Sequence, residues 1–279
     1  MLELNKIHQG DSAILLKQIN DNSIDLTVTS PPYDNLRDYK GYSFDFETIA
    51  KELYRVTKEG GVVVWVVGDE TKDFCESLSS FKQAIYFVEK CGFNLLDTMI
   101  YKKNGSPSPY PNMRRYALIF EYMFVFSKGK PKTFNPIKDR KNKSHGKINS
   151  GNTARQKDGT TKSSGSYLQK KYSIRTNIWT YDVGKNKDTK DVIALQHPAR
   201  FPELLAKDHI LTWSNPKEII LDPFAGSGTT LKMAKLNNRK YIGLEVSEEY
   251  CKIAQNRVSS LLPLAEQQEG GDGVNSSHQ

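Results

Sequence analysis

The stretch that decides the fold is Leu221-Asp222-Pro223-Phe224-Ala225-Gly226-Ser227-Gly228-Thr229-Thr230. It follows a short apolar segment and opens a helical pattern, and its two glycines let the backbone turn tightly and approach a ligand closely. The amides at the start of the helix would then face that ligand. The stretch is not a P-loop, because no lysine precedes the two threonines, and not a complete dinucleotide fingerprint, because Leu231 replaces the third glycine.

An acidic residue in the right place extends this motif to a nucleoside-binding plan. Glu245 ends the apolar segment 241–244, 17 residues after Gly228. A carboxylate at the end of the next strand can accept hydrogen bonds from both ribose hydroxyls. The alternative is a structural tight turn with a surface glutamate, which the placement of both parts disfavours.

Strand-like and helix-like segments alternate along most of the chain. The apolar patterns predict strands at 23–29, 62–67, 93–101, 116–127, 218–221 and 241–244, and helices at 46–57, 80–90, 202–213, 228–236 and 247–262. Gly60-Gly61 is expected to break the chain before the strand at 62–67. This alternation predicts an α/β fold with a mostly parallel sheet that is covered on both faces. Ligands of such sheets bind at the carboxyl ends of strands.

The net charge of +8 is unevenly distributed over the chain. The segment from Lys128 to Arg175 has 14 Lys or Arg and two acids, Asp139 and Asp158, so it carries +12 and the remainder −4. A basic insert indicates a polyanionic partner, most often nucleic acid, although a solvated, disordered loop is the alternative. We expect residues 144–166, which are nearly low-complexity, to stay mobile without a partner. Nearby aromatic residues either anchor the insert to the body or stack on bases: Phe134, Tyr167, Tyr172, Trp179 and Tyr181.

Composition excludes several classes of protein. A chain of 279 residues suits one α/β domain with an insertion, or two small domains. No run approaches the roughly 20 apolar residues of a membrane helix, and the N-terminus has no apolar signal core. Cys75, Cys91 and Cys251 lie far apart and form neither a metal-binding spacing nor a disulfide framework. We therefore expect a cytoplasmic protein without a metal site.

A second motif, Thr29-Ser30-Pro31-Pro32-Tyr33, follows an apolar strand. The two prolines fix φ and remove two backbone donors, so carbonyl groups are left to accept hydrogen bonds. Ser30 adds a hydroxyl and Tyr33 an aromatic face. This combination suits an amino group on a flat ring, but a rigid turn that closes a strand explains the motif alone equally well.

Together the two motifs resemble those of the amino-methylating DNA methyltransferases. Ser30-Pro31-Pro32-Tyr33 resembles their catalytic motif, and Phe224-Ala225-Gly226-Ser227-Gly228-Thr229 resembles their S-adenosyl-L-methionine motif. The catalytic motif precedes the cofactor motif, with a variable segment between them, as in the circularly permuted β group. The resemblance covers residues 1 to about 262. It implies a Rossmann-like methyltransferase fold with an inserted basic target-recognition region.

Weaker matches assign further residues by the same resemblance. Asp11, in Gln9-Gly10-Asp11-Ser12, would accept from the adenine amino group of the cofactor, and the segment His197-Pro198-Ala199-Arg200-Phe201-Pro202-Glu203 would help cradle its methionine part. Residues 64–69 and 121–128 resemble the strands that wall the target pocket. The implied catalytic residues are Ser30, Pro31, Pro32 and Tyr33, and the implied cofactor-binding residues are Asp11, Phe224, Ala225, Gly226, Gly228, Thr229, Glu245, His197 and Phe201.

The resemblance also divides the chain and suggests its partners. It implies a catalytic half at 1–127, a target-recognition insert at 128–190, a cofactor-binding half at 191–264 and a disordered tail at 265–279. The expected partner is double-stranded DNA, in a restriction-modification context. A homodimer and a separately acting cognate restriction endonuclease are left open.

The implied reaction moves a methyl group to an exocyclic amino nitrogen of a base that is flipped out of the duplex. Serine at the first motif position is more usual in the cytosine-amino enzymes of this family and aspartate in the adenine-amino enzymes, so Ser30 favours N4 of cytosine over N6 of adenine. Two rival interpretations are a non-catalytic nucleic-acid-binding protein with a decayed nucleotide fold, and an RNA or protein methyltransferase. The filled key positions disfavour the first, and the basic insert disfavours the second.

Overall fold

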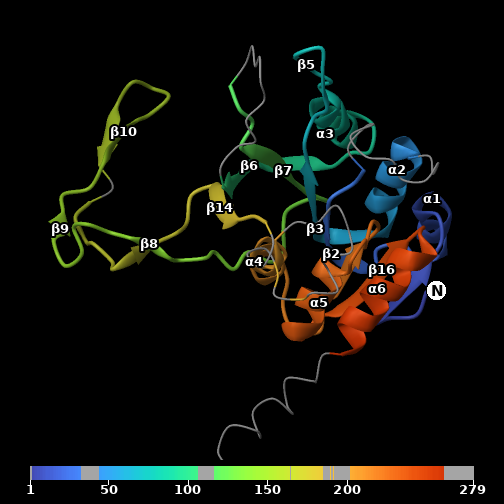
Figure 1. The fold of residues 1–279 in the computed structure, drawn as a ribbon. Coiled ribbons are helices and arrows are strands. Elements are labelled where there is room, and N and C mark those ends of the chain that lie inside the picture. The colour runs from blue at the N-terminus through green and yellow to red at the C-terminus, as the bar shows by residue number, and fades with distance from the viewer. Residues whose placement is uncertain are drawn as a thin grey trace, which may run out of the picture. The chain divides into compact units, whose positions relative to one another are not determined.

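The computed structural model describes residues 2–32, 44–105, 116–163, 165–184, 189, 191 and 202–260. The chain divides into two compact units, which are considered separately (Figure 1). The larger unit combines Met1–Asn135 with Asn177–Gln279, and the smaller unit is Pro136–Thr176. The smaller unit falls inside the predicted insert at 128–190, and the predicted tail at 265–279 lies outside the described residues.

The larger unit is built on an eight-stranded sheet with the strand order β1-β16-β15-β2-β3-β7-β6-β14. In that order the strands are Lys6–Gln9, Lys240–Glu245, Ile219–Asp222, Ile24–Thr29, Thr57–Val67, Phe120–Ser127, Asn94–Asn104 and Ile178–Asp182. All neighbours are parallel except β7, which is antiparallel to both β3 and β6. The predicted α/β fold with a mostly parallel sheet is therefore confirmed.

Helices cover this sheet. They are α1 (Ser12–Leu15), followed by a 3-10 turn (Leu16–Gln18), α2 (Phe46–Val56), α3 (Ser79–Glu89), α4 (Glu203–Trp213), α5 (Thr229–Leu236) and α6 (Glu248–Ser259). Buried side chains of α1, α2 and α3 share a core with Trp65 and Leu244 of the sheet. On the other face, α5 packs so closely on β16 that a Cβ at Gly243 would lie 2.3 Å from Leu231 Cδ1.

The predicted break at Gly60-Gly61 is wrong. Strand β3 begins at Thr57, directly after α2, and runs through both glycines to Val67. Gly60 has φ +80°, and the pairing with β2 shifts register between Ile24 and Leu26. Glycine accommodates such a bulge, and a Cβ on Gly61 would lie 2.8 Å from Thr57 Cγ2. The two glycines therefore bend the strand instead of ending the segment.

The smaller unit is a two-stranded antiparallel ribbon, here called the basic arm (residues 136–176). Three nested pairs form it: β8 (Arg140–Lys141) with β13 (Tyr172–Ser173), β9 (Ile148–Asn149) with β12 (Tyr167–Leu168), and β10 (Thr153–Arg155) with β11 (Thr161–Ser163). Three of these strands lie within residues 144–166, whose composition predicts mobility without a partner. Short antiparallel ladders need only backbone hydrogen bonds and a glycine at the turn, such as Gly159 with φ +85°. Amino-acid composition does not show such pairing.

The aromatic residues around the insert divide between the two units of the chain. Trp179 and Tyr181 belong to β14 of the main sheet and are buried there, so they are part of the packing of the larger unit. The ring of Phe134 lies 5.1 Å from that of Trp213 on α4, centroid to centroid. By contrast, Tyr167 and Tyr172 are exposed on the basic arm.

In the described ranges of the chain, no helix has the length and apolar character needed to span a lipid bilayer. Nor do three or more His, Cys, Asp or Glu side chains of these ranges come together as a metal-binding group.

Candidate active site

Five parallel strands, β1, β16, β15, β2 and β3, lie side by side, so their carboxyl ends meet at one edge of the sheet. The candidate residues follow four of these strands. Asp11 comes after β1, Glu245 ends β16, the glycine loop (residues 223–228) follows β15, and Ser30 follows β2. Tyr33, His197 and Phe201, which the sequence also assigns to the site, lie outside the described residues.

The glycine loop has a backbone conformation that side chains would disturb. Gly226 and Gly228 have φ of +50° and +78°, in the left-handed region that favours glycine. A Cβ on Gly228 would lie 3.0 Å from the Cβ of Ala254 on α6. The absence of a side chain at Gly228 thus lets the loop pack directly on α6. A turn of this kind before a helix can present backbone amides to a ligand.

Glu245 is tied to the glycine loop by its carboxylate. Its Oε2 accepts a hydrogen bond from Gly226 N at 2.8 Å, and its Oε1 accepts one from Ser247 N at 2.9 Å. Burial raises the pKa of Glu245, and these backbone N–H groups oppose the rise by stabilising the charged form. Each carboxylate oxygen can accept a second hydrogen bond, so the group suits a diol that reaches the loop.

The turn after β1 is fastened to the same loop. Asp11 Oδ1 accepts from Ala13 N at 2.7 Å and so caps α1. The next residue, Ser12, donates from its hydroxyl to the carbonyl of Pro223. Asp11 is half-buried at this edge of the sheet. The structure therefore brings Asp11, Glu245 and the glycine loop together, as the resemblance implies for a cofactor site.

A buried hydrogen bond joins the two motifs. Thr29, the residue before Ser30, donates from Oγ1 to Asp222 Oδ1 at 2.6 Å, and Phe224 N donates to the same oxygen at 3.1 Å. Burial raises the pKa of Asp222 to about 6, while the bonds from Thr29 and Phe224 act in the opposite direction. This pair sets the end of β2 directly beside the glycine loop. Ser30 and Pro32 are half-buried there, and Pro31 is buried.

Aromatic rings stand next to this junction. The ring of Phe224 lies 5.5 Å from Phe44 and 6.1 Å from Trp65, centroid to centroid. Trp65 is in register with Thr29 across β2 and β3, and its Nε1 donates to Gln83 Oε1 at 2.8 Å. The segments predicted to wall a target pocket, 64–69 and 121–128, fall largely on β3 and β7, which pair antiparallel.

A group of charges behind the glycine loop contains Glu203, from the segment 197–203 that the sequence singled out, and three residues that it did not. Arg257 on α6 and Lys232 on α5 pair there with Asp191 and Glu203. One signal was available in the helical pattern: Arg257 follows Ala254 by three residues and lies on the buried face of α6. A charged residue on an apolar helix face indicates buried partners.

Comparison with known proteins gives a consistent result. The family model N6_N4_Mtase, described as DNA methylase, matches residues 24–256. The orphan methyltransferase M.BamHII of Bacillus amyloliquefaciens is 58% identical over 256 residues, which are 91% of this chain and 96% of that protein. The type II methyltransferase M.BglII of Bacillus subtilis is 29% identical over 265 residues, covering 92% of this chain and 69% of its own.

Solved structures show the same fold. The cytosine-N4-specific PvuII DNA methyltransferase superposes with a TM-score of 0.65 at 21% identity, covering 95% of this chain and 89% of that one. A complex of M1.HpyAVI with S-adenosylmethionine superposes with a TM-score of 0.61 at 24% identity, covering 92% and 99% of the two chains. At these identities the similarity establishes the fold alone.

Proposed function

The chain belongs to the N6/N4 DNA methylase family, and from this premise we propose that it methylates N4 of cytosine in double-stranded DNA, using Ser30 and the prolines after it. Its activity is that of an S-adenosylmethionine-dependent DNA methyltransferase. The single observation that supports the choice of cytosine is serine at the first position of the catalytic motif.

The relatives do not decide between the two bases. PvuII DNA methyltransferase is named as cytosine-N4-specific, whereas YhdJ of Escherichia coli, 28% identical over 276 residues, is named a DNA adenine methyltransferase. Methylation of N6 of adenine is therefore the second candidate. It places the same demands on the motif, because both bases present an amino group on a flat ring.

The proposed cofactor site consists of Asp11, the glycine loop and Glu245, with His197 and Phe201 proposed from the resemblance alone. Its fit rests on two observations: two glycines with positive φ that shape the turn into α5, and the buried carboxylate of Glu245, which is hydrogen-bonded to the loop. When bound, S-adenosylmethionine supplies an electrophilic methyl group. Glu245 would accept hydrogen bonds from the ribose hydroxyls of the cofactor, and Asp11 would accept one from its adenine amino group.

The proposed role of the chain in the reaction is to position a weak nucleophile. The lone pair of an exocyclic amino nitrogen is delocalised into the base. If Ser30 Oγ and the Pro31 carbonyl each accept one amino hydrogen, they hold the nitrogen in place and stabilise the positive charge that develops on it. Tyr33 would stack on the base. The buried bond between Thr29 and Asp222 supports this arrangement, because it fixes the end of β2 beside the glycine loop.

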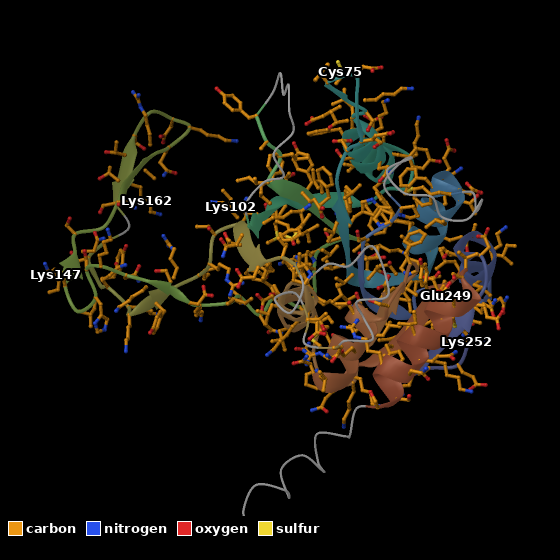
Figure 2. The ribbon with its side chains drawn as sticks, viewed as in Figure 1. Cys75, Lys102, Lys147, Lys162, Glu249 and Lys252 are labelled. Atoms are coloured by element: carbon orange, nitrogen blue, oxygen red, sulfur yellow. The ribbon has the colours of Figure 1, made fainter. Side chains whose placement is uncertain are left out.

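The basic arm is the proposed DNA-contacting element. It contains eleven Lys or Arg and two Asp, and Lys147 and Lys162 are exposed on it (Figure 2). A two-stranded antiparallel ribbon can enter the major groove, and phosphate contacts help offset the cost of flipping a base. Neutralising three arm residues with Arg140→Gln, Lys147→Gln and Lys162→Gln should weaken DNA binding and reduce the slope of log K against log salt by about 3.

The control removes three lysines outside the arm, Lys17, Lys51 and Lys252, which are exposed on the larger unit. Lys252 is labelled on α6 in Figure 2. An equal change of salt slope in both triple variants would contradict a specific role of the basic arm. A homodimer, a separate cognate endonuclease and a cytoplasmic location stay predictions, and light scattering of the purified chain tests the first.

The cofactor is tested by calorimetry. Titration of the whole protein with S-adenosylmethionine should give one saturable site per chain. Absence of binding would revive the interpretation as a nucleic-acid-binding protein without activity. Competition between DNA and RNA for the enzyme tests the substrate, and a strong preference for RNA would overturn it.

A further inference from the structure

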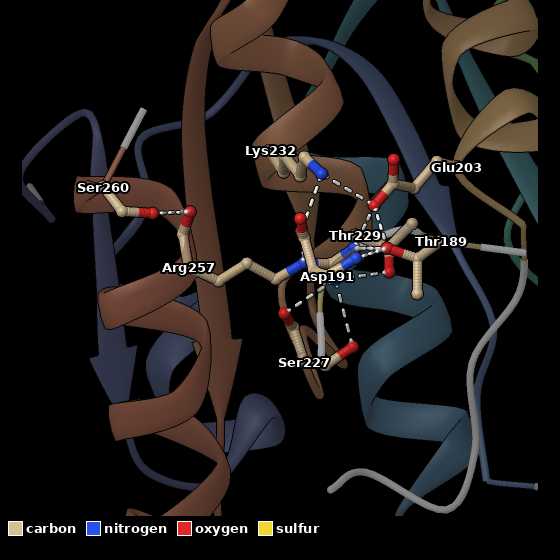
Figure 3. A network of polar contacts seen from close by, with 8 residues as sticks. All are labelled: Thr189, Asp191, Glu203, Ser227, Thr229, Lys232, Arg257 and Ser260. Atoms are coloured by element: carbon tan, nitrogen blue, oxygen red, sulfur yellow. Dashed lines mark hydrogen bonds and ion pairs between the residues drawn. The ribbon is translucent and has the colours of Figure 1, made fainter. Parts of the chain in front are cut away.

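A buried charge cluster lies behind the glycine loop and consists of Asp191, Glu203, Lys232 and Arg257 (Figure 3). The side chain of Arg257 is 1% exposed and that of Lys232 is 9% exposed. The side chains of Glu203 and Asp191 are 19% and 30% exposed, so two buried cations are paired with two partly buried carboxylates. They come from α5, α6 and the chain before and at the start of α4.

Arg257 contacts the glycine loop directly. Its Nη1 donates to the carbonyl oxygen of Ser227 at 3.0 Å and to Thr229 Oγ1 at 2.9 Å. These two residues stand on either side of Gly228, whose φ of +78° sets the turn into α5. The guanidinium therefore stabilises the glycine loop at Gly228, where the backbone has a positive φ.

The remaining nitrogens of Arg257 face a different segment. Its Nε donates to Asp191 Oδ2 at 2.7 Å, and its Nη2 donates to Glu203 Oε1 and, at 3.3 Å, to Thr189 Oγ1. Lys232 Nζ reinforces both ends, at 2.6 Å from Asp191 Oδ2 and 2.8 Å from Glu203 Oε1. Asp191 and Glu203 flank residues 192–201, the segment that contains His197 and Phe201.

Stability alone does not account for this cluster. Burying the Lys232 and Arg257 cations carries a desolvation penalty, and well-packed apolar residues often replace buried ion pairs at no loss of stability. What apolar residues could not reproduce is the geometry. A planar guanidinium donates in several fixed directions at once, which a point charge such as Lys does not.

We infer that Arg257, supported by Lys232, is a positioning residue of the cofactor site. It fixes the Ser227–Thr229 turn and, at the same time, contacts Asp191 and Glu203. One buried side chain thereby ties the turn of the glycine loop to residues that are far from it in sequence. The inference rests on the proposed function only for the identity of the cofactor.

The chain offers a matched control in Arg239, which is also buried. Its Nη2 donates to the Ser214 carbonyl oxygen at 2.6 Å and its Nη1 to the Asn237 carbonyl oxygen at 2.6 Å. It precedes β16, at the opposite end of that strand from Glu245. Arg239→Gln and Arg257→Gln thus each remove one buried guanidinium, but only the second lies at the glycine loop.

The experiment measures S-adenosylmethionine binding by calorimetry and thermal stability for both variants. Arg257→Gln should weaken binding by about tenfold or more, raise KM for the cofactor and change kcat at saturation by less than about threefold. Arg239→Gln should lower the melting temperature without changing the affinity more than about twofold. Arg257→Lys keeps the positive charge but loses the planar guanidinium with its several N–H donors. Its affinity for S-adenosylmethionine should therefore fall between those of the wild type and Arg257→Gln.

Hydrogen exchange supplies a readout that a general loss of stability would not produce. In Arg257→Gln, peptides covering 223–230 and peptides covering 189–205 should exchange faster together, whereas Arg239→Gln should leave both unchanged. If Arg257→Gln does not fold, Lys232→Met tests the same cluster and should weaken binding to a smaller extent. Wild-type affinity in a folded Arg257→Gln, or equal loss in both variants, would overturn the inference. Failure of the wild type to bind the cofactor would instead overturn the proposed function.

Discussion

Replacing Thr29 by valine removes the hydroxyl that joins the two motifs and preserves the branched shape of the side chain. Thr29 Oγ1 lies 2.6 Å from Asp222 Oδ1, and both residues are buried. After the change, Oδ1 retains the hydrogen bond from Phe224 N. The substitution therefore tests how strongly the end of β2 is held to the glycine loop.

The magnitude depends on pH, because the acceptor titrates. Burial raises the pKa of Asp222 from 3.8 to about 6, so its carboxyl is largely neutral at pH 5 and charged at pH 8. Because the folded state binds this proton more tightly, the contribution of Asp222 to stability is greatest below pH 4. It declines by about 3 kcal/mol as the pH rises past 6.

Loss of a hydrogen bond to a charged acceptor costs about 2 to 3 kcal/mol, and loss of one to a neutral acceptor about 1 kcal/mol. Thr29→Val should therefore lower the free energy of unfolding by about 2 to 3 kcal/mol at pH 8 and about 1 kcal/mol at pH 5. The pKa of Asp222 should rise further, since a bond that lowers it is lost.

Urea unfolding at the two pH values measures these differences, and Asp222→Asn provides the control. Asparagine keeps an acceptor oxygen but carries no charge, so in that background Thr29→Val should cost about 1 kcal/mol at both pH values. Equal losses at pH 5 and pH 8 in the Asp222 protein, or additive effects of the two substitutions at pH 8, would refute the reasoning.

Three substitutions separate the proposed roles of the site residues. Ser30→Ala should lower kcat by about 100-fold with cofactor affinity unchanged, because Ser30 would contact the target base; a matching loss of affinity in calorimetry argues against that role. Glu245→Gln should weaken cofactor binding by about tenfold, since an amide cannot accept from Gly226 N, Ser247 N and a diol together; unchanged affinity removes Glu245 from the ribose site. Gly228→Ala should destabilise the fold by about 1 to 2 kcal/mol in thermal melts, because of its positive φ and the nearby Ala254, and a neutral result contradicts the strain.

Local sequence patterns predicted the helices and strands better than they predicted which strands pair with each other. The continuous apolar run at Val62–Val67 indicated burial on both faces and so predicted a strand. The helical pattern that follows the glycine motif predicted α5 after Gly228. The prediction at Gly60-Gly61 was wrong because a glycine pair looks the same in a sequence whether it ends a strand or forms a bulge within one. Only the pairing with the neighbouring strand β2 distinguishes the two cases. The placement of Trp179 in the main sheet likewise depends on pairing with β6.

The candidate site follows the same division. The glycine loop and Glu245 were predictable because each follows a strand at a characteristic spacing. The contacts that unite the site were not, because Thr29 and Asp222 are 193 residues apart and Arg257 reaches Glu203 across 54 residues. No periodicity encodes such pairs, and the only hint was a charge on the buried face of α6.

The most direct test of the central proposal is a nucleoside analysis of DNA methylated in vitro. Unmethylated genomic DNA is incubated with the whole protein and S-adenosylmethionine, digested to nucleosides and analysed by mass spectrometry, with Ser30→Ala as the inactive control. The proposal predicts N4-methylcytosine as the product. N6-methyladenine as the only methylated nucleoside would contradict it.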